Sequence, residues 1–583
     1  MENLYIRTRN LNLLSKIKKA LYFFTKREWY VFFVFLLVLL VSTVGILQTI
    51  NKSFMVSVPT EGGSITEGIV GTPRFVNPIL ATGDADKDLT TLIYAGLMRK
   101  DGAGQFVPDL AQEFTISKDG LVYTFILKDK IYFHDDTEVT AKDVIFTIDK
   151  IKDIEVKSPL KSNWDGINVT KIDDKTIQFT LKQPYASFLE NTTVGILPMK
   201  IWDNTTPVEL NTANINPVGA GPYKVSAVKK QAEGIVDYYE LKTFKKFHLG
   251  KPYIKNITLR FYQNEEDLLD ALLKKEVEQA SSISPENALN LSQKGYQVES
   301  TVLPRIFGLF FNQNQNQIFT NKNVVKAIDL AINKEAIVEE IFSGYGVPID
   351  SPIPPNMINY QKLGKMNETT YIDRKKEAED ILAKDGWKKN TEGFLEKTIT
   401  ENKKKVASTL EFSISTGNAK ELATSAELIK KDLMEIGIKV DIKTFEVGNL
   451  NQMVIRPRKY DALLFGQIIN HESDLFAFWH STQRKDPGLN VAMYTNIKVD
   501  KILEDAFVTI DEKNRIKKYA QFEDEIKKDM PAVFLYSPDF IYVVSKNLKN
   551  LSIEHIASPR DRFLNSYLWY TKIDNVWKIF AKQ

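Results

Sequence analysis

One uncharged segment near the start of the chain constrains its fold more than any other feature. No residue between Trp29 and Asn51 carries a charge, and the stretch Val31–Leu47 is almost entirely apolar. A helix needs about 20 such residues to cross the hydrocarbon core of a bilayer. No later stretch of the sequence approaches this length. We therefore expect one transmembrane helix at residues 29–50, followed by a water-soluble body.

The charges beside this segment predict its orientation. Residues 1–30 carry seven basic and two acidic side chains, a net charge of +5. Basic residues favour the cytoplasmic side of a membrane helix, so we expect residues 1–28 in the cytoplasm and the body on the extracellular or periplasmic side. A cleaved signal peptide is the alternative. Its apolar core is usually about 7–15 residues long and ends at a small-x-small site, and Ile46-Leu47-Gln48 is a poor cleavage context.

Composition excludes several classes of protein. The chain has 583 residues, of which 43% are hydrophobic and 26% are charged; at about 100–200 residues per domain, this length predicts about three lobes. The net charge is +3, so the residues after position 30 sum to −2, which argues against nucleic acid as a partner. The chain has no cysteine, which excludes disulfides, thiolate metal sites, cysteine nucleophiles and a lipid-modified cysteine anchor.

No motif for catalysis or metal binding appears. The five histidines form no HExxH motif, and there is no P-loop, GxGxxG or GxSxG pattern. The run Asp84–Asp88 resembles the start of a calcium loop, but Leu89 and Ala95 stand where glycine and glutamate are needed. We expect a helix N-terminus there instead. The sequence thus predicts a binding protein, not an enzyme, with no cofactor and no bound metal.

Local patterns predict α/β lobes with largely parallel sheets. Hairpins are expected at 114–127 and 167–181, and Thr140 with Asp143 forms a capping box before a helix. Strands alternate with helices beyond residue 254, including one helix at 323–342. Charged residues 388–405 indicate an exposed hairpin or loop.

Several segments in order resemble the extracellular solute-binding protein family 5, the oligopeptide-, dipeptide- and nickel-binding receptors of ABC importers. The similarity runs from about Gly62 to Leu551. The family pattern has glycine at the position of Asp136. We therefore expect a turn here that holds a non-glycine residue at positive φ, at some cost in free energy. The matching segments are GGSITEGIVGTPRFVNPIL with IYAGL, IYFHDDTEVTAKDVIFTI, GPYKV, LFFN followed by VVKAIDLAINKEAIVEEIFSGYGVPIDSPIPP, DALLFG, FWHS, YTNIKVDKILEDA and DMPAVFLYSPDFIYVVS.

The resemblance implies a two-lobed, hinged, periplasmic-binding-protein-like fold with an inserted subdomain. Such a receptor closes on a ligand held between its lobes. The organisation that we expect is a basic cytoplasmic segment at 1–28, a transmembrane anchor at 29–50, a tether at 51–61, a discontinuous first lobe at 62–85, 199–305 and 536–583, an inserted subdomain at 86–198, and a second lobe at 306–535.

The resemblance also implies a binding site. In the peptide-binding members, the ligand backbone pairs like an added strand with one segment from each lobe. The family often has Trp-x-x-Asp in the second segment, whose aspartate pairs with the peptide ammonium; here Gln467 and Asn470 stand at those positions. Trp479 is either a core residue or part of the cleft wall. The expected ligand-binding residues are Thr72, Pro73, Arg74, Asn77, Gly466, Gln467, Ile468, Ile469, Asn470 and Trp479.

These inferences predict a monomeric, membrane-anchored receptor that captures oligopeptides and delivers them to ABC permease subunits. The same receptor class for another solute, such as a glycan, an opine, a nickel chelate or a signalling peptide, is the main alternative. A cell-surface hydrolase would need a nucleophile–base pair or a metal constellation, which the sequence does not show. A chaperone-like protein that holds unfolded segments in the cleft is a further alternative.

Overall fold

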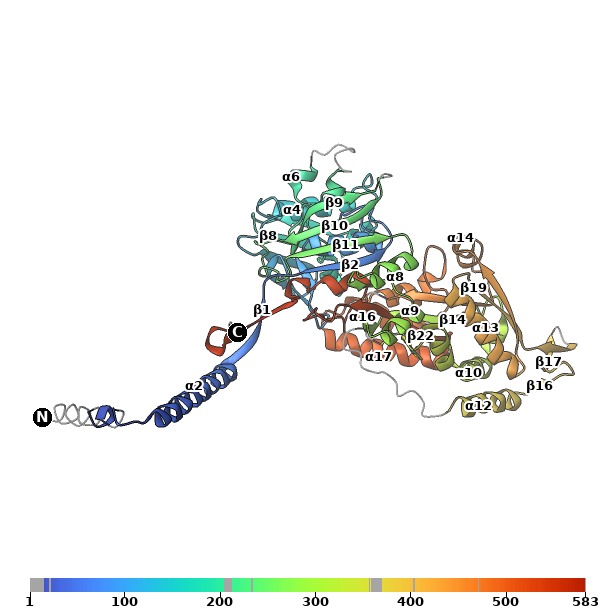
Figure 1. Cartoon of the computed structure of the whole chain (residues 1–583). Helices are drawn as coiled ribbons and strands as arrows, with labels where there is room; N and C mark the ends of the chain where they lie inside the picture. The colour runs from blue at the N-terminus through green and yellow to red at the C-terminus, as the bar shows by residue number, and fades with distance from the viewer. Residues whose placement is uncertain are drawn as a thin grey trace. The chain divides into compact units, whose positions relative to one another are not determined.

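The computed structural model describes residues 15–19, 22–203, 212–231, 234–355, 357, 370–401, 404–469 and 471–581 (Figure 1). The chain separates into two compact units. The smaller unit combines the N-terminal part, up to Thr60, with the residues from Lys572 onward. The larger unit, Glu61–Thr571, is the body.

The smaller unit consists of a long helix and a two-stranded ribbon. Helix α2, Lys26–Phe54, begins at a capping box in which Thr25 and Glu28 bond to each other's backbone N–H. Within the described residues, it is the one helix with the length and apolar composition to cross a membrane. The segment 51–61, expected as a plain tether, contains strand β1, Met55–Thr60, which pairs antiparallel with β23, Lys572–Trp577.

The body is organised by one large sheet. Its strands follow the order β20-β19-β21-β14-β22-β12-β2-β11-β10-β9, and β13 and β15 also pair with β22. Their bounds are β2 Ser64–Val70, β9 Tyr223–Lys230, β10 Val236–Thr243, β11 Asn256–Tyr262, β12 Gln279–Ala280, β13 Gln297–Val302, β14 Arg305–Phe311, β15 Gly346–Pro348, β19 Glu411–Gly417, β20 Lys439–Phe445, β21 Ala462–Ile468 and β22 Ala532–Val544.

The sheet has two halves that share the long strand β22 (Figure 1). The first part of β22 pairs with β14 and β15, and its last six residues pair with β13. We call the part built on β2 and β9–β13, together with the residues inserted between β2 and β9, the first lobe. The part built on β14, β15 and β19–β21 is the second lobe. The expectation of largely parallel sheets was wrong. Among the described strands of this sheet, only β2 with β11 and β12, and β19 with β20 and β21, pair in parallel. The pairs β9–β10, β10–β11 and β14–β21, and those of β22 with its neighbours, are antiparallel.

Alternating side chains place helices on both faces of the second lobe's sheet. On β14, Leu309 and Phe311 pack with α10 (Lys322–Ala331) and α13 (Lys420–Glu435). On the same strand, Ile306 and Phe310 belong to a second cluster with α16 and α17, which span Ile497–Val508 and Glu512–Asp529. Successive residues of a strand point to opposite faces, so one short apolar strand supports two cores.

A separate four-stranded sheet of order β5-β6-β8-β7 lies between β2 and β9 in the sequence. The two predicted hairpins are confirmed as antiparallel β5–β6 and β7–β8 pairs, and the predicted capping box begins α4, Ala141–Lys152. Asp136 has φ 68°, as expected where the family pattern has glycine. The strand bounds are β5 Ala111–Ile116, β6 Val122–Leu127, β7 Asn168–Lys171 and β8 Thr176–Thr180.

The single helix expected at 323–342 is two helices. Helix α10 ends at Ala331, and α11, Lys334–Phe342, begins after Asn333, whose side chain accepts a hydrogen bond from the N–H of Ala336 (3.1 Å). Asparagine is a favoured N-cap, and the apolar spacing continued through the break and concealed it. The charged segment 388–405 forms the hairpin of β17, Leu395–Glu401, and β18, Lys404–Thr409.

A fully buried ion-pair cluster joins the main sheet to the residues after it. Arg562 donates to Glu67 on β2 (2.6 and 2.8 Å) and to both carboxylate oxygens of Asp88 (2.6 and 3.0 Å) on α3, Asp84–Ile93. The hydroxyl of Tyr542 on β22 lies 2.8 Å from Glu67 and 2.6 Å from Gln279. Burial raises the pKa of both carboxyl groups despite the opposing effect of the guanidinium.

Replacing Arg562 by methionine should destabilise the protein by about 3–5 kcal/mol, because Glu67 and Asp88 would remain buried without their cation. Thermal unfolding of the full chain in detergent micelles measures this change. The matched control is Arg560→Met two residues earlier, whose side chain is about half exposed and should cost less than about 1 kcal/mol. Equal losses for the two variants would show that the cluster does not hold the fold together.

Candidate functional site

Two of the cavities in the described part of the body adjoin each other. The first, of about 350 Å³, is formed by the first lobe and the four-stranded region, and His471 of the second lobe also lines it. The second, of about 290 Å³, is lined by both lobes, among others by Ser187 and Glu190 on one side and by Ile469 and Arg515 on the other. Glu190 and His471 line both cavities and therefore mark where they adjoin.

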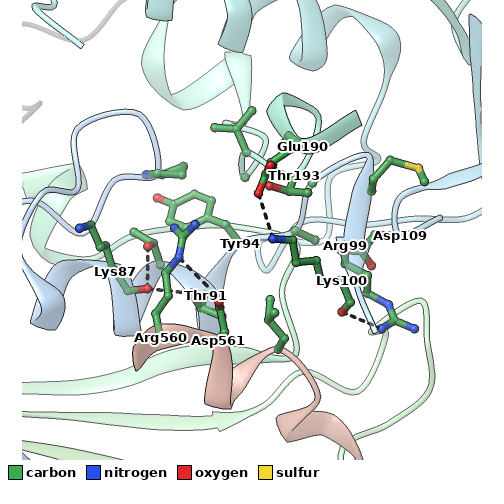
Figure 2. A pocket seen from close by; sticks show the side chains of 18 of the residues that line it. Lys87, Thr91, Tyr94, Arg99, Lys100, Asp109, Glu190, Thr193, Arg560 and Asp561 are labelled. Carbon is green, nitrogen blue, oxygen red and sulfur yellow. Dashed lines mark hydrogen bonds and ion pairs between the residues drawn. The ribbon is translucent and has the colours of Figure 1, made fainter. Parts of the chain in front are cut away.

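An ion-pair chain connects the lobes at this point. Glu190, in the short helix α5 (Phe188–Asn191), accepts a hydrogen bond from Lys100 Nζ (2.9 Å), as Figure 2 shows, and pairs with His471 Nδ1 of the second lobe. Burial opposes ionisation of Glu190, but His471 and Lys100 outweigh it and lower the pKa of the carboxyl group. Burial alone would lower the pKa of His471, whereas Glu190 raises it above its ordinary value.

Other contacts between the lobes adjoin this ion pair. The rings of Tyr185 and Phe507 stack with centroids 5.0 Å apart, and the backbone N–H of Ala186 donates to the carbonyl of Phe507 (3.1 Å). The hydroxyl of Tyr185 lies 3.4 Å from the hydroxyl of Ser473. Residues 185–190 therefore dock on the second lobe through stacking, backbone and charged contacts together.

The second cavity contains a buried ion pair. Arg515 of α17 pairs with Glu472 and donates to the carbonyls of Thr509 (3.1 Å) and Ile510 (2.9 Å). Burial raises the pKa of Glu472, and the nearby guanidinium opposes that shift. Both side chains are almost completely buried. The charge of Arg515 in the cavity wall is thus already paired with Glu472 of the protein itself.

The backbone of β21 has an open edge at Gly466 and Ile468. The N–H of Ile469 donates to the carbonyl of Pro304 beside β14 (2.9 Å). Alternate residues of an antiparallel strand bond to the same neighbour, so Gly466 and Ile468 direct their N–H and C=O groups to the opposite edge. On that edge β19 pairs only with Ala462 and Leu463. In the part of the chain that the structure describes, no strand lies beside Gly466 and Ile468.

The predicted residues around this edge differ in exposure. Ile468 is 51% exposed, whereas Gln467 is buried, and its carboxamide has no hydrogen-bond partner among the described residues. Buried polar groups are normally paired, so a ligand or an ordered water is the expected partner of Gln467. Among the predicted residues that the structure describes, only Ile469 lines either cavity. Asn470 lies outside the described residues.

The first predicted segment is held by α3. Asp86 accepts hydrogen bonds from the backbone N–H groups of Arg74 (2.7 Å) and Phe75 (2.9 Å). Thr72 and Arg74 are exposed and Pro73 is buried. Asn77 is buried, and its side-chain oxygen accepts from the N–H of Ile79 (3.1 Å), which closes a turn. The expected helix N-terminus at Asp84–Asp88 is present, and no cluster of metal-ligating side chains occurs in the described ranges.

Trp479 lies in the core of the second lobe. Its side chain has no exposed surface, and its ring contacts those of Phe310, Phe522 and Phe534. Of the two interpretations of this residue, the structure therefore supports the core position. The ring has no free surface on which a ligand could lie in this conformation.

The fold and the cavities define a hinged, two-lobed binding protein of mixed α/β structure. The chain belongs to the bacterial extracellular solute-binding proteins, family 5: the family model described as "family 5 Middle" matches residues 105–487.

Named relatives agree with this assignment. The oligopeptide-binding protein AppA of Bacillus subtilis is 27% identical over 530 residues, which cover 88% of this chain and 92% of AppA. Its structure with a nonapeptide has a TM-score of 0.64, with 26% identity over 88% of this chain and 100% of that chain. NikZ of Campylobacter jejuni, solved with Ni(L-His), has a TM-score of 0.64 and 26% identity over 87% of this chain and 99% of that chain. These relatives confirm the periplasmic-binding-protein-like fold.

The residues that connect the lobes were not predicted. Glu190 and His471 are far apart in the sequence, and neither belongs to a recognisable motif. His471 is one of the five histidines that form no HExxH motif. Its position beside the expected ligand-binding segment 466–470 was the one available signal, and no pattern indicated its carboxylate partner.

The His471–Glu190 contact should stabilise the folded protein most strongly at mildly acidic pH. Because the folded-state pKa of His471 is raised, its contribution is complete below the ordinary histidine pKa of about 6.5 and is lost as the pH rises through the raised value. Lys100 and Asp474 also face this histidine. The difference in free energy of unfolding between wild type and His471→Gln, measured by thermal unfolding, should therefore be larger at pH 6 than at pH 9, by on the order of 1 kcal/mol.

His555→Gln is the control for this experiment, because His555 lines the second cavity and has no ion pair among the described residues. A difference between wild type and His471→Gln that stays constant with pH would contradict the charged form of the contact.

Proposed function

We propose that this protein is the substrate-binding receptor of an ABC importer and that its ligand is a peptide. The observation that carries the proposal is the open edge of β21. A peptide laid along Gly466 and Ile468 would form main-chain hydrogen bonds, which every peptide sequence can provide. Thr72–Arg74 is the proposed contact from the first lobe. Pro73 has no N–H, so pairing on that side is incomplete.

The relatives support a peptide more than another solute. AppA is named as an oligopeptide-binding protein and was solved with a nonapeptide. NikZ, with a similar score, was solved with Ni(L-His), so the shared fold alone does not select the ligand. The unpaired backbone groups favour a ligand that carries N–H and C=O groups in a regular order. We propose that Asn470, at the position of the family's aspartate, takes the place of the charged partner of the peptide ammonium.

The proposed closure is a rotation about two strand crossings. Leu303 and Pro304 join β13 to β14, and Ser537 and Pro538 lie where β22 passes from one lobe to the other. The N–H of Leu303 donates to the carbonyl of Pro538 (3.0 Å), so the two crossings touch. We propose lobes divided at about residues 305 and 536, with 86–198 as the inserted subdomain. A ligand stabilises the closed form through contacts with both lobes.

We also propose that α2 anchors the receptor in the cell membrane, with the N-terminus in the cytoplasm and the body outside. The helix is exposed along its apolar length, and the basic cluster precedes it. An uncleaved anchor would take the place of the absent lipid-modified cysteine.

Replacing Ile468 by proline should weaken peptide binding at least about fivefold, because it removes one N–H from the open edge, worth about 1 kcal/mol. This N–H does not bond to β14, so the sheet keeps its internal hydrogen bonds. Ile468→Ala is the matched control, since it removes the exposed side chain and keeps the N–H. The measurement is titration calorimetry with a peptide that native mass spectrometry finds on the purified protein.

Equal affinities for the proline and alanine variants would contradict pairing at this edge. Retention of a solute without peptide bonds would contradict the peptide assignment while leaving the receptor class unchanged.

A further inference from the structure

The smaller unit gathers exposed apolar side chains at the end of α2 that faces away from the N-terminus. Phe54, in the last turn of the helix, is 59% exposed. Trp577 (48%), Ile579 (77%) and Phe580 (72%) are exposed on β23 and on the following turn η7, Lys578–Phe580. These residues come from opposite ends of the described chain, more than 500 positions apart.

The β1–β23 ribbon brings them together. Met55, the first residue after α2, pairs with Trp577, and the register continues to Thr60 with Lys572. The indole N–H of Trp577 donates to the side-chain oxygen of Asn51 within α2 (2.7 Å). Figure 1 shows the C-terminal segment, in red, beside the junction of α2 and β1. The position of Trp577 is therefore fixed relative to the last turns of the helix.

Helix length places this contact at a membrane boundary. At 1.5 Å per residue, the apolar stretch from Trp29 to about Ile50 spans roughly 30 Å, the thickness of the hydrocarbon core. Asn51 is the first polar position after Ile50 and begins the polar end of the helix, with Lys52 and Ser53. Tryptophan is enriched at this level, where its ring contacts lipid and its N–H reaches a polar group.

We propose that Trp577, Ile579 and Phe580 insert into the outer interface of the same bilayer that α2 crosses, as a second lipid contact of the receptor. The proposal rests on the proposed membrane anchor. A lipid surface fits because the patch continues the apolar surface of α2. Lys52 and Lys578 are also exposed there and can reach anionic headgroups. The ribbon orients the segment, so the apolar side chains gain lipid contact without a further ordering of the chain.

The absence of cysteine allows site-directed spin labelling of the full chain. A nitroxide on Ala581→Cys leaves all three apolar side chains in place and reports their depth. The protein is reconstituted in vesicles of phosphatidylcholine and phosphatidylglycerol, and relaxation by oxygen is compared with relaxation by a water-soluble nickel chelate. The oxygen-to-nickel ratio at position 581 should exceed that at Asp574→Cys, which lies further along β23 from the helix, at least about threefold.

Adding Ile579→Ser and Phe580→Ser to the Ala581→Cys chain should lower its ratio to the value at position 574. A label at Val41→Cys tests the anchor separately, because Val41 lies in the middle of α2. A lipid-buried label at 41 with an aqueous label at 581 would overturn this inference and leave the anchor standing. An aqueous label at 41 would overturn both. Low accessibility to both reagents at 581 would show that protein covers the patch, and would also overturn the lipid contact.

Discussion

The buried guanidinium of Arg562 is the interaction on which the body of this protein depends most. It joins Glu67 in the middle of the main sheet, Asp88 on the helix that leads to the four-stranded region, and the residues that follow β22. Three segments distant in the sequence therefore meet at one fully buried charge. Two carboxylates and one guanidinium leave an excess negative charge, so full burial favours a proton on one of them.

The Tyr542 hydroxyl completes the cluster between Glu67 Oε2 and Gln279 Oε1. It has one proton, so it donates to only one of these groups and accepts from the other. A proton on Glu67 and a carboxamide of Gln279 that presents its N–H to Tyr542 each satisfy this requirement. Burial raises the pKa of Glu67, and the guanidinium of Arg562 opposes that shift.

The elements with a local signal could be predicted from the sequence, and the contacts between distant segments could not. Hairpins, capping boxes and the family motifs depend on residues a few positions apart, so 114–127 and Thr140 were assigned correctly. The break at Asn333 was missed because the apolar spacing continued through it. The alternation of strands and helices led to the expectation of largely parallel sheets. That pattern carries no information about the direction of β22, which runs antiparallel to its neighbours. The expected ligand-binding residues stay a prediction. The open edge at Gly466 and Ile468 has the free backbone groups that pairing with a peptide would need.

The chain passes between the smaller unit and the body twice, after Thr60 and before Lys572. Thr60 and Lys572 are paired in the ribbon, and the body begins and ends at the neighbouring residues Glu61 and Thr571. Within the smaller unit the two chain segments that lead to the body are therefore a hydrogen-bonded pair of strands. A paired ribbon resists stretching and twisting more than one strand does, because its backbone groups are bonded across the register. The closure proposed above, about the crossings at Pro304 and Pro538, lies within the body and does not involve this ribbon.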